Sequence, residues 1–75
     1  METQDELDRA AGAALKELRQ RSGLSQEDVA ADANMDQSML SKVERLGPSA
    51  TGWRRFCMVA FALGMVVEIK FKRRE

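Results

Sequence analysis

Four hydrogen-bonding side chains close together in the sequence carry most of the chemistry that this chain offers. They are Gln37, Ser38, Ser41 and Lys42. Their types suit noncovalent recognition, because an amide can pair with adenine through two hydrogen bonds and an ammonium group can donate to guanine or to phosphate. The chain has no histidine and one cysteine, which excludes a zinc finger, a disulfide framework and a histidine-based acid–base site within one chain. We therefore expect a binding protein without cofactor or metal, not an enzyme.

The surrounding residues predict two short helices that would hold these side chains in place. Ser25 is placed to cap a helix over residues 26–33, which has an apolar face at helical spacing. Asn34 falls where a left-handed residue would end that helix, and Asp36 can cap a second helix over residues 37–45. The spacing therefore predicts a helix, a tight turn and a second helix.

The second helix should present a polar face that is almost free of acid. Leu40 and Val43 are three residues apart and would face the interior. The positions left on the outer surface are Gln37, Ser38, Ser41, Lys42 and Arg45. A helix with this outer face can enter the major groove of DNA and contact the edges of the bases.

The chain resembles the Cro and phage-repressor type of helix-turn-helix, the Xre family of bacterial regulators. The resemblance runs from about Leu15 to Gly64 and is carried by LKELRQRSGLSQEDVA, by SMLSKVER and by a helix that ends in FALG. Two positions depart from the family pattern, since Asn34 stands where glycine is usual and Asp36 where a hydroxyl residue is commoner. The resemblance implies a mainly α fold, a four- to five-helix DNA-binding domain over residues 1–64.

The chemistry and position of the side chains indicate roles for individual residues, and the resemblance adds that of Gln26 as a phosphate contact. The expected base contacts are Gln37, Ser38, Met39, Ser41 and Lys42, and the expected phosphate contacts are Gln26, Arg45, Arg54 and Arg55. Met39 would meet a thymine methyl group or, equally, cover the edge of the core. The two arginines after Trp53 would reach phosphate or remain solvated. A basic residue near the end of the first helix pairs in this family with an acid in the recognition helix, and Arg19 and Glu44 match those positions.

Two longer helices should flank the helix-turn-helix. The first is predicted over residues 6–21, with Gly12 inside it as a position where a neighbour could approach closely. The proline-containing stretch 46–50 reads as a loop, and Thr51 is placed to cap a helix that ends at Gly64. Its expected inward face comprises Trp53, Phe56, Cys57, Ala60, Phe61 and Leu63. A buried Cys57 would act as a small hydrophobe, which we favour over a redox-sensing thiol.

The tail, residues 65–75, changes to a period of two. Met65, Val67, Ile69 and Phe71 alternate with mostly charged residues, which predicts one β-strand. A lone strand needs a second strand, most simply that of another copy of the chain, so we expect a homodimer. Such a strand is similar to the dimer-forming tail of Xre-type antitoxins. The basic residues Lys70, Lys72, Arg73 and Arg74 would contact phosphate or keep the strand edge soluble.

Charge separates the two halves of the chain. Residues 1–36 hold nine acids and four bases, net −5, and residues 37–75 hold three acids and eight bases, net +5. This asymmetry would orient the domain on double-stranded DNA. No membrane segment or signal peptide is expected, so we expect a cytoplasmic, nucleoid-associated protein. The leading interpretation is a dimeric repressor of an inverted-repeat operator. One alternative is an antitoxin that also neutralises a toxin, and another is a protein-interaction module without DNA binding.

Overall fold

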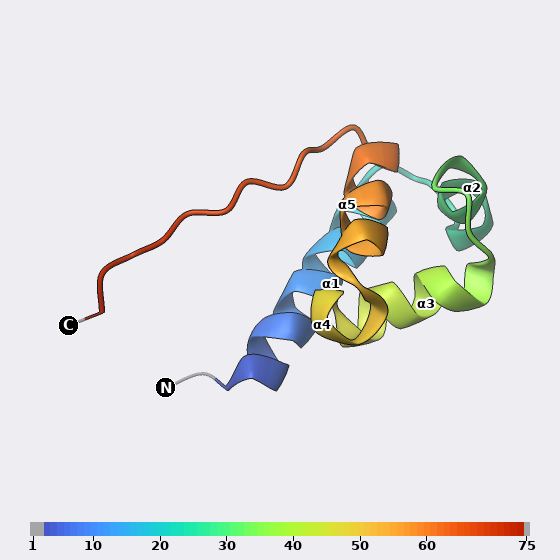
Figure 1. The fold of residues 1–75 in the computed structure, drawn as a ribbon. Coiled ribbons are helices and arrows are strands. Elements are labelled where there is room, and N and C mark those ends of the chain that lie inside the picture. Colours follow the sequence, from blue (N-terminus) through green and yellow to red (C-terminus); the bar gives the residue numbers. More distant parts are fainter. Residues whose placement is uncertain (1–2, 75) are drawn as a thin grey trace.

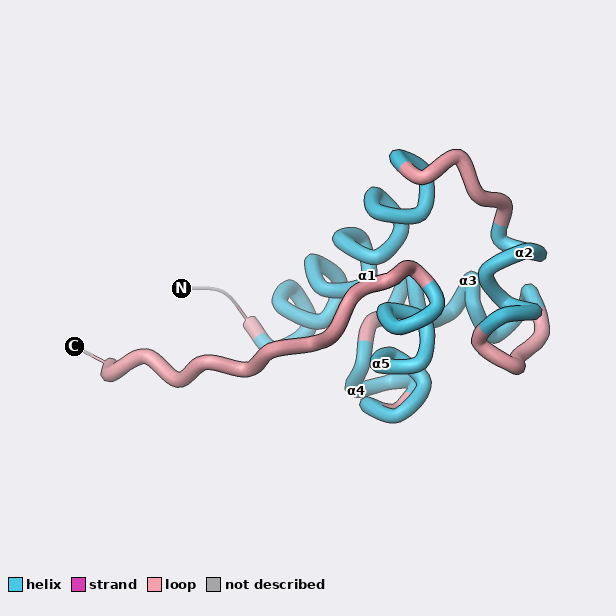
Figure 2. The backbone as a smooth tube through the Cα atoms, turned by 90° about the horizontal axis from the view of Figure 1, so that it is seen from above, coloured by secondary structure: helices cyan, strands magenta, loops and turns pink. Residues whose placement is uncertain are grey.

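The computed structural model describes residues 3–74 and places five α-helices in that range (Figure 1). They are α1 (Gln4–Arg21), α2 (Gln26–Asp32), α3 (Gln37–Leu46), α4 (Pro48–Thr51) and α5 (Trp53–Ala62). The described residues contain no β-strand, and the chain after α5 runs away from the helices as an extended tail (Figures 1 and 2). The mainly α fold is as predicted, with a short fourth helix that the sequence interpretation placed in a loop.

Helix α1 packs directly against α3 through its glycine. Thr3 caps the helix, since its hydroxyl accepts a hydrogen bond from the backbone N–H of Glu6. A Cβ atom added at Gly12 would lie 2.6 Å from the backbone carbonyl oxygens of both Val43 and Glu44. The two helix backbones therefore approach more closely than any side chain would allow, which confirms that Gly12 admits a close neighbour.

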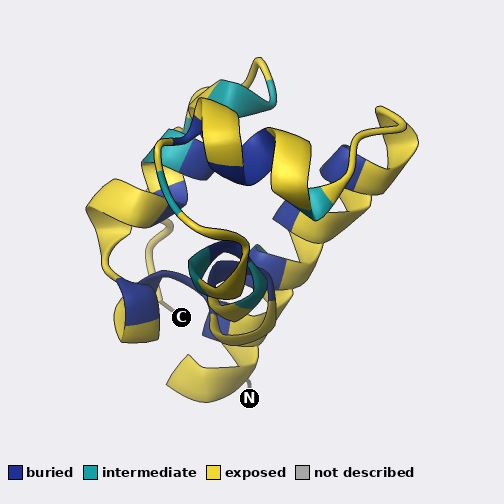
Figure 3. Cartoon of the chain, turned by 90° about the vertical axis from the view of Figure 1, so that its right-hand side faces the viewer, coloured by how far each residue is buried: buried dark blue, intermediate teal, exposed yellow. Residues whose placement is uncertain are grey.

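The hydrophobic core lies where α1, α2, α3 and α5 face one another. Figure 3 shows the buried positions on the inner sides of these helices. The buried apolar residues are Leu15, Val29, Ala30, Ala33, Leu40, Val43, Phe56, Val59 and Ala60. Most of them are small or β-branched, so the helices of this short chain can pack closely around a compact centre.

The segment after α3 differs from the prediction. Pro48 starts helix α4 at a position where a missing N–H costs nothing, so residues 46–50 are not a loop. Gly52 then adopts φ +96° and interrupts the helix before α5 begins at Trp53. Thr51 does not cap α5, because its side chain is turned back and its hydroxyl donates to the carbonyl of Gly47 at 2.8 Å. The predicted cap at Thr51 was therefore wrong, whereas the predicted helix is present as α5, with Gly64 at φ +78° just beyond its end.

Helix α5 turns a different face to the core than the sequence indicated. Phe56 and Ala60 are buried as predicted, whereas Trp53 is 51% exposed and Phe61 is 75% exposed. Cys57 is exposed too. These three outward residues are four apart, so they form one stripe beside the buried one. No helix among the described residues, this apolar one included, is long and apolar enough to cross a membrane.

The tail is extended but has no partner strand. The backbone N–H of Met65 donates to the carbonyl of Ala60 at 2.9 Å, and Val67 is half-buried against the core. Ile69 and Phe71 are exposed. A strand exists only through hydrogen bonds to a neighbouring strand, and a single chain supplies none here. The expected strand is therefore not formed in the single chain, and its pairing across a dimer stays a prediction.

Candidate nucleic-acid interface

Two capping side chains and one left-handed residue define where α2 begins and how the chain turns into α3. Ser25 caps α2 by accepting a hydrogen bond from the N–H of Asp28 at 3.1 Å, and Asp36 caps α3 by accepting from the N–H of Met39 at 2.7 Å. Asn34 lies between them with φ +56°. Short side chains of this kind tolerate the left-handed conformation, which lets the chain reverse within a few residues. Both predicted caps and the predicted left-handed residue are confirmed.

Helix α3 keeps its apolar side inside and its hydrogen-bonding side in solvent. Leu40 and Val43 are fully buried. Of the residues expected to contact bases or phosphate from α3, Gln37, Ser38, Lys42 and Arg45 are exposed, and Met39 and Ser41 are half-buried. The exposed face therefore carries amide, hydroxyl and cationic groups, while the only acid of the helix, Glu44, is buried.

Glu44 is neutralised from inside the protein by Arg19. The Nε atom of Arg19 donates to Oε2 of Glu44 at 2.7 Å, and Nη2 donates to Oε1 at 3.2 Å. The side chains are 11% and 1% exposed, respectively. A third guanidinium contact reaches the carbonyl of Leu24 at 3.0 Å, just before α2. The expected ion pair is thus present, and it joins α1, the start of α2 and α3.

Two glutamines extend this network to the surface. The amide nitrogen of Gln26 donates to Oε1 of Glu44 at 2.9 Å. The amide nitrogen of Gln37 then donates to the amide oxygen of Gln26 at 3.3 Å. Each glutamine directly follows the capping residue of its helix, but the contact between them depends on how α2 and α3 cross, which the sequence does not show. Gln26 thus links the buried Glu44 to the exposed Gln37. The expected contact of Gln26 with phosphate stays a prediction.

The two arginines of α5 lie beside the helix-turn-helix turn. Arg54 and Arg55 are exposed and border a hollow of about 390 Å³ that also includes Asn34 and Met35. Arg55 donates from Nη1 to the carbonyl of Thr51 at 3.1 Å, which leaves its other guanidinium N–H groups for further partners. Both side chains therefore add positive charge next to the turn that leads into α3.

Sequence reasoning missed a polar contact that holds α1 to α4. Asp8 is buried, and its Oδ1 accepts from the hydroxyl of Ser49 at 2.9 Å and from the Ser49 N–H at 3.3 Å. Gly47 lies against the same place, since an added Cβ would overlap the carbonyl group of Asp8. No feature of the sequence pairs Asp8 with Ser49, because they are far apart in the chain and each is an ordinary surface residue type.

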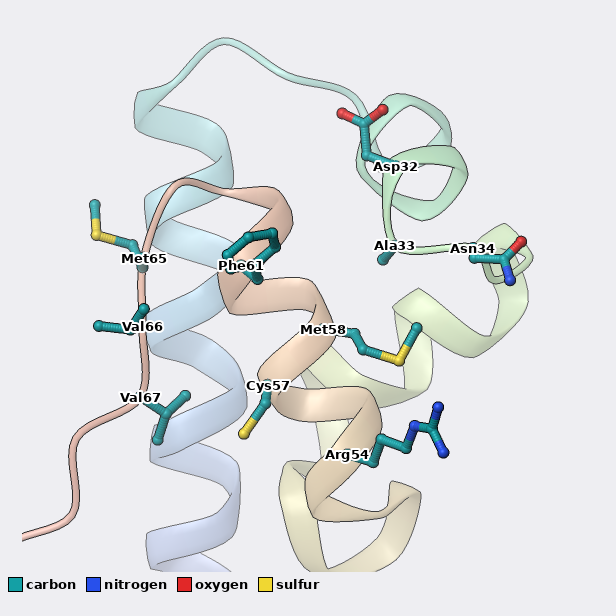
Figure 4. A pocket seen from close by; sticks show the side chains of 10 residues that line it. All are labelled: Asp32, Ala33, Asn34, Arg54, Cys57, Met58, Phe61, Met65, Val66 and Val67. Carbon is teal, nitrogen blue, oxygen red and sulfur yellow. The ribbon is translucent and has the colours of Figure 1, made fainter.

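An apolar groove of about 520 Å³ lies along α5, between the end of α2 and the start of the tail (Figure 4). It is lined by Asp32, Ala33 and Asn34 at the end of α2, by Arg54, Cys57, Met58 and Phe61 from α5, and by residues 65–67 from the tail. The expected core position of Cys57 is therefore wrong, since the thiol faces this groove. Within residues 3–74 no three His, Cys, Asp or Glu side chains come close enough together to hold a metal ion.

Comparison with known families agrees with this geometry. The family model described as helix-turn-helix domain matches residues 10–59, which include α2, α3, α4 and most of α1 and α5. The chain belongs to this family, as its resemblance to the Xre regulators implied, and is a DNA-binding protein of the helix-turn-helix class. No curated protein matches it closely enough to count as a relative.

Proposed function

We propose that the protein is a dimeric, sequence-specific repressor that binds an inverted-repeat operator through the major groove. The observation that carries this proposal is the exposed side of α3, which has hydrogen-bond donors and cations while its one acid is buried and paired. A repressor of this kind acts by occupying a promoter. The family supports DNA binding, and the arrangement of the side chains supports readout of sequence.

Base readout would begin at the first turn of α3. Gln37 can form two hydrogen bonds with adenine, and its link to Gln26 would restrict the directions in which its amide points. Ser38 can bond either class of base, and Lys42 can donate to guanine or to phosphate. The half-buried Met39 and Ser41 would contribute smaller contacts at the edge of this surface.

Phosphate contacts would position the domain on the duplex. Arg45 at the end of α3 and the α5 arginines, Arg54 and Arg55, are exposed on the positive half of the chain. These charges attract DNA without regard to its sequence. Binding strength and sequence preference should therefore depend on different residues.

The direct test is selection of binders from random duplex DNA with the purified protein at low ionic strength. A two-fold dimer presents two α3 helices about 34 Å apart, so selected sequences should contain inverted half-sites with centres about 10 base pairs apart. The matched control is the double variant Gln37→Ala, Lys42→Ala, which removes two outward side chains without touching the core. No enrichment over this control would contradict sequence-specific recognition.

Repression is tested separately with a reporter gene. The selected operator is placed over the promoter or well upstream of it, and expression is compared with and without the protein. Occupation of the promoter should lower expression only in the overlapping arrangement. Increased expression in the upstream arrangement would instead indicate an activator and contradict the proposed mechanism.

A further inference from the structure

The tail combines exposed apolar side chains with unused backbone groups. Phe71 is 97% exposed and Ile69 is 61% exposed, although both are strongly apolar. Among residues 66–74, which the structure describes, no backbone N–H or carbonyl group forms a backbone hydrogen bond. Both features are typical of a strand edge that lacks its neighbour. The proposed dimer supplies one, and the residues of the tail restrict how the two copies can align.

Symmetry limits the possible alignments of two antiparallel tails. In an antiparallel pair, residues directly opposite each other project on the same face of the sheet, whereas neighbours in the chain project on opposite faces. A two-fold axis perpendicular to the sheet keeps each residue on the same face in both copies. A residue therefore cannot lie opposite the copy of its neighbour, and the axis must pass where one residue meets its own copy.

Charge distinguishes the central alignments. With Ile69 on the axis, two apolar side chains meet, and each Glu68 lies opposite the partner's Lys70. With Glu68 on the axis, two carboxylates would meet, and with Lys70 on the axis, two ammonium groups would meet. Opposite charges across a strand pair are stabilising and like charges are destabilising. Glu68 and Lys70 already project to one side of the tail, since their charged atoms are 3.2 Å apart in the single chain.

The outer alignments are less favourable. An axis at Val67 would pair residues 64–70 only, and Gly64 has φ +78°, which is not an extended conformation. It would also leave Phe71 beyond the paired region. An axis at Phe71 would place Lys70 opposite the partner's Lys72, again two like charges. The alignment centred on Ile69 is the one that pairs the whole segment 65–73 and opposes no like charges.

We propose that the two tails pair antiparallel with Ile69 on the two-fold axis, which seats the partner's Phe71 on the apolar groove beside α5. This inference rests on the proposed dimer and specifies how it forms. In this alignment the partner's Phe71 lies opposite Val67 and on the same face of the sheet. Val67 is half-buried against the core and lines the groove. The two grooves of the dimer would each receive one phenylalanine.

The groove has the size and chemistry for an aromatic side chain. Its volume is about 520 Å³, and Cys57, Met58, Phe61 and Met65 are among the residues that line it (Figure 4). Sulfur atoms and an aromatic ring favour contact with a second aromatic ring. Cys57 and Phe61, the two residues of the outward stripe of α5 that line this groove, would be covered in the dimer, although Phe61 is 75% exposed in the single chain.

Disulfide formation at single positions measures the alignment. The native thiol is first removed by Cys57→Ala, and the size of this parent protein in solution and its shift of selected duplex DNA are recorded. Three variants then each carry one new cysteine, Glu68→Cys, Ile69→Cys or Lys70→Cys, and are oxidised under identical mild conditions. Only a residue that faces its own copy brings two Cβ atoms close enough for a disulfide.

The expected result is fast covalent dimer formation by Ile69→Cys and slow formation by the other two. Faster reaction of Glu68→Cys or Lys70→Cys would overturn the alignment. Slow reaction of all three would also overturn this alignment, even if the parent is dimeric. The DNA shift of the uncrosslinked parent reports on the proposed function independently, so loss of one conclusion does not imply loss of the other.

A second experiment tests whether Phe71 occupies the groove beside α5 of the partner. Phe71→Ala should weaken dimerisation about tenfold or more, because burial of an apolar side chain of this size is lost from both grooves. Lys72→Ala is the matched control, since it shortens the next residue on the other face of the tail. Dissociation constants from sedimentation equilibrium that are equal for the two variants would overturn the placement of Phe71.

Discussion

At the scale of single residues, the Arg19–Glu44 ion pair should matter most for stability. Arg19→Met removes the cation and leaves a carboxylate that is 1% exposed with one hydrogen bond from Gln26. An unpaired buried charge costs about 3–5 kcal/mol. We expect urea unfolding to show a loss of this size in the free energy of unfolding.

The control for this prediction is the pair formed by Glu17 and Arg21 on α1. Its Nη2–Oε1 distance is 2.6 Å, but both side chains are largely exposed. Exposed pairs contribute about 1 kcal/mol or less, so Arg21→Met should hardly change the unfolding curve. Equal effects of Arg19→Met and Arg21→Met would contradict the structural role of the buried pair.

The contact between Gln26 and Gln37 leads to a prediction about specificity. Gln37→Ala should cost about 1–3 kcal/mol in binding to the selected operator and relax preference at one base pair of each half-site. If Gln26 acts by orienting Gln37, the double variant Gln26→Ala, Gln37→Ala should lose little more binding free energy than Gln37→Ala alone. Competition titrations against operators altered at single positions measure both effects. Strictly additive losses would show that the two glutamines make separate contacts with DNA.

At the scale of helices, Gly12 sets the separation of α1 and α3. Helix propensity alone favours alanine over glycine by about 1 kcal/mol, yet Gly12→Ala would place a methyl group 2.6 Å from two backbone oxygens. Because backbone cannot move aside as a side chain can, we expect Gly12→Ala to be destabilising. Thermal unfolding checks this, with the exposed Ala13→Gly as the control for propensity. A stabilised Gly12→Ala protein would contradict the close packing.

The parts of the fold that depend on local rules could be predicted from the sequence. Ser25, Asn34 and Asp36 define the ends of α2 and α3 through caps and a left-handed residue, each set by its nearest neighbours. The break at Gly52 was not predictable in this way. Pro48 can begin a helix as readily as it can sit in a loop, and only packing decides between them.

Which side of a helix faces the core depends on the rest of the molecule. On α5, Trp53, Phe56 and Phe61 are all apolar, so the sequence indicates one broad inward face, but only Phe56 is buried. In a small domain the other helices cover one stripe only. The candidate site is likewise only partly predictable from the sequence. The outer face of α3 follows from the spacing of its apolar residues, whereas the Gln26–Gln37 contact depends on how α2 and α3 cross.

At the scale of the whole molecule, the arginines of α5 should contribute to affinity without affecting sequence preference. Arg54→Ala and Arg55→Ala together should weaken binding to operator and unrelated DNA to a similar extent. Each lost phosphate contact should reduce the slope of log affinity against log salt by about 0.9. Titrations at several salt concentrations measure this slope. Arg21→Ala, which removes an exposed arginine from α1, is the control, and an unchanged slope in the α5 variant would exclude these arginines as phosphate contacts.

Removal of residues 68–75 should separate folding from dimerisation. The buried core lies within residues 15–60, and the contacts of Met65 and Val67 with the helices are kept. We therefore expect a folded monomer with greatly reduced affinity for the inverted repeat, since two linked half-sites bind far more tightly than one. Sedimentation velocity and circular dichroism measure assembly and helix content. A shortened chain that still sediments as a dimer would contradict strand pairing.

The tail touches its own helices only at its first residues, and residues 68–74 are exposed. The tail, which is proposed to determine the dimer partner, and α3, which is proposed to determine the operator, are thus separate segments of the chain. Mutations in either piece could accumulate without disturbing the other. After a gene duplication, a few changes in the tail would suffice to stop two paralogues from mixing, while both kept their old target promoters.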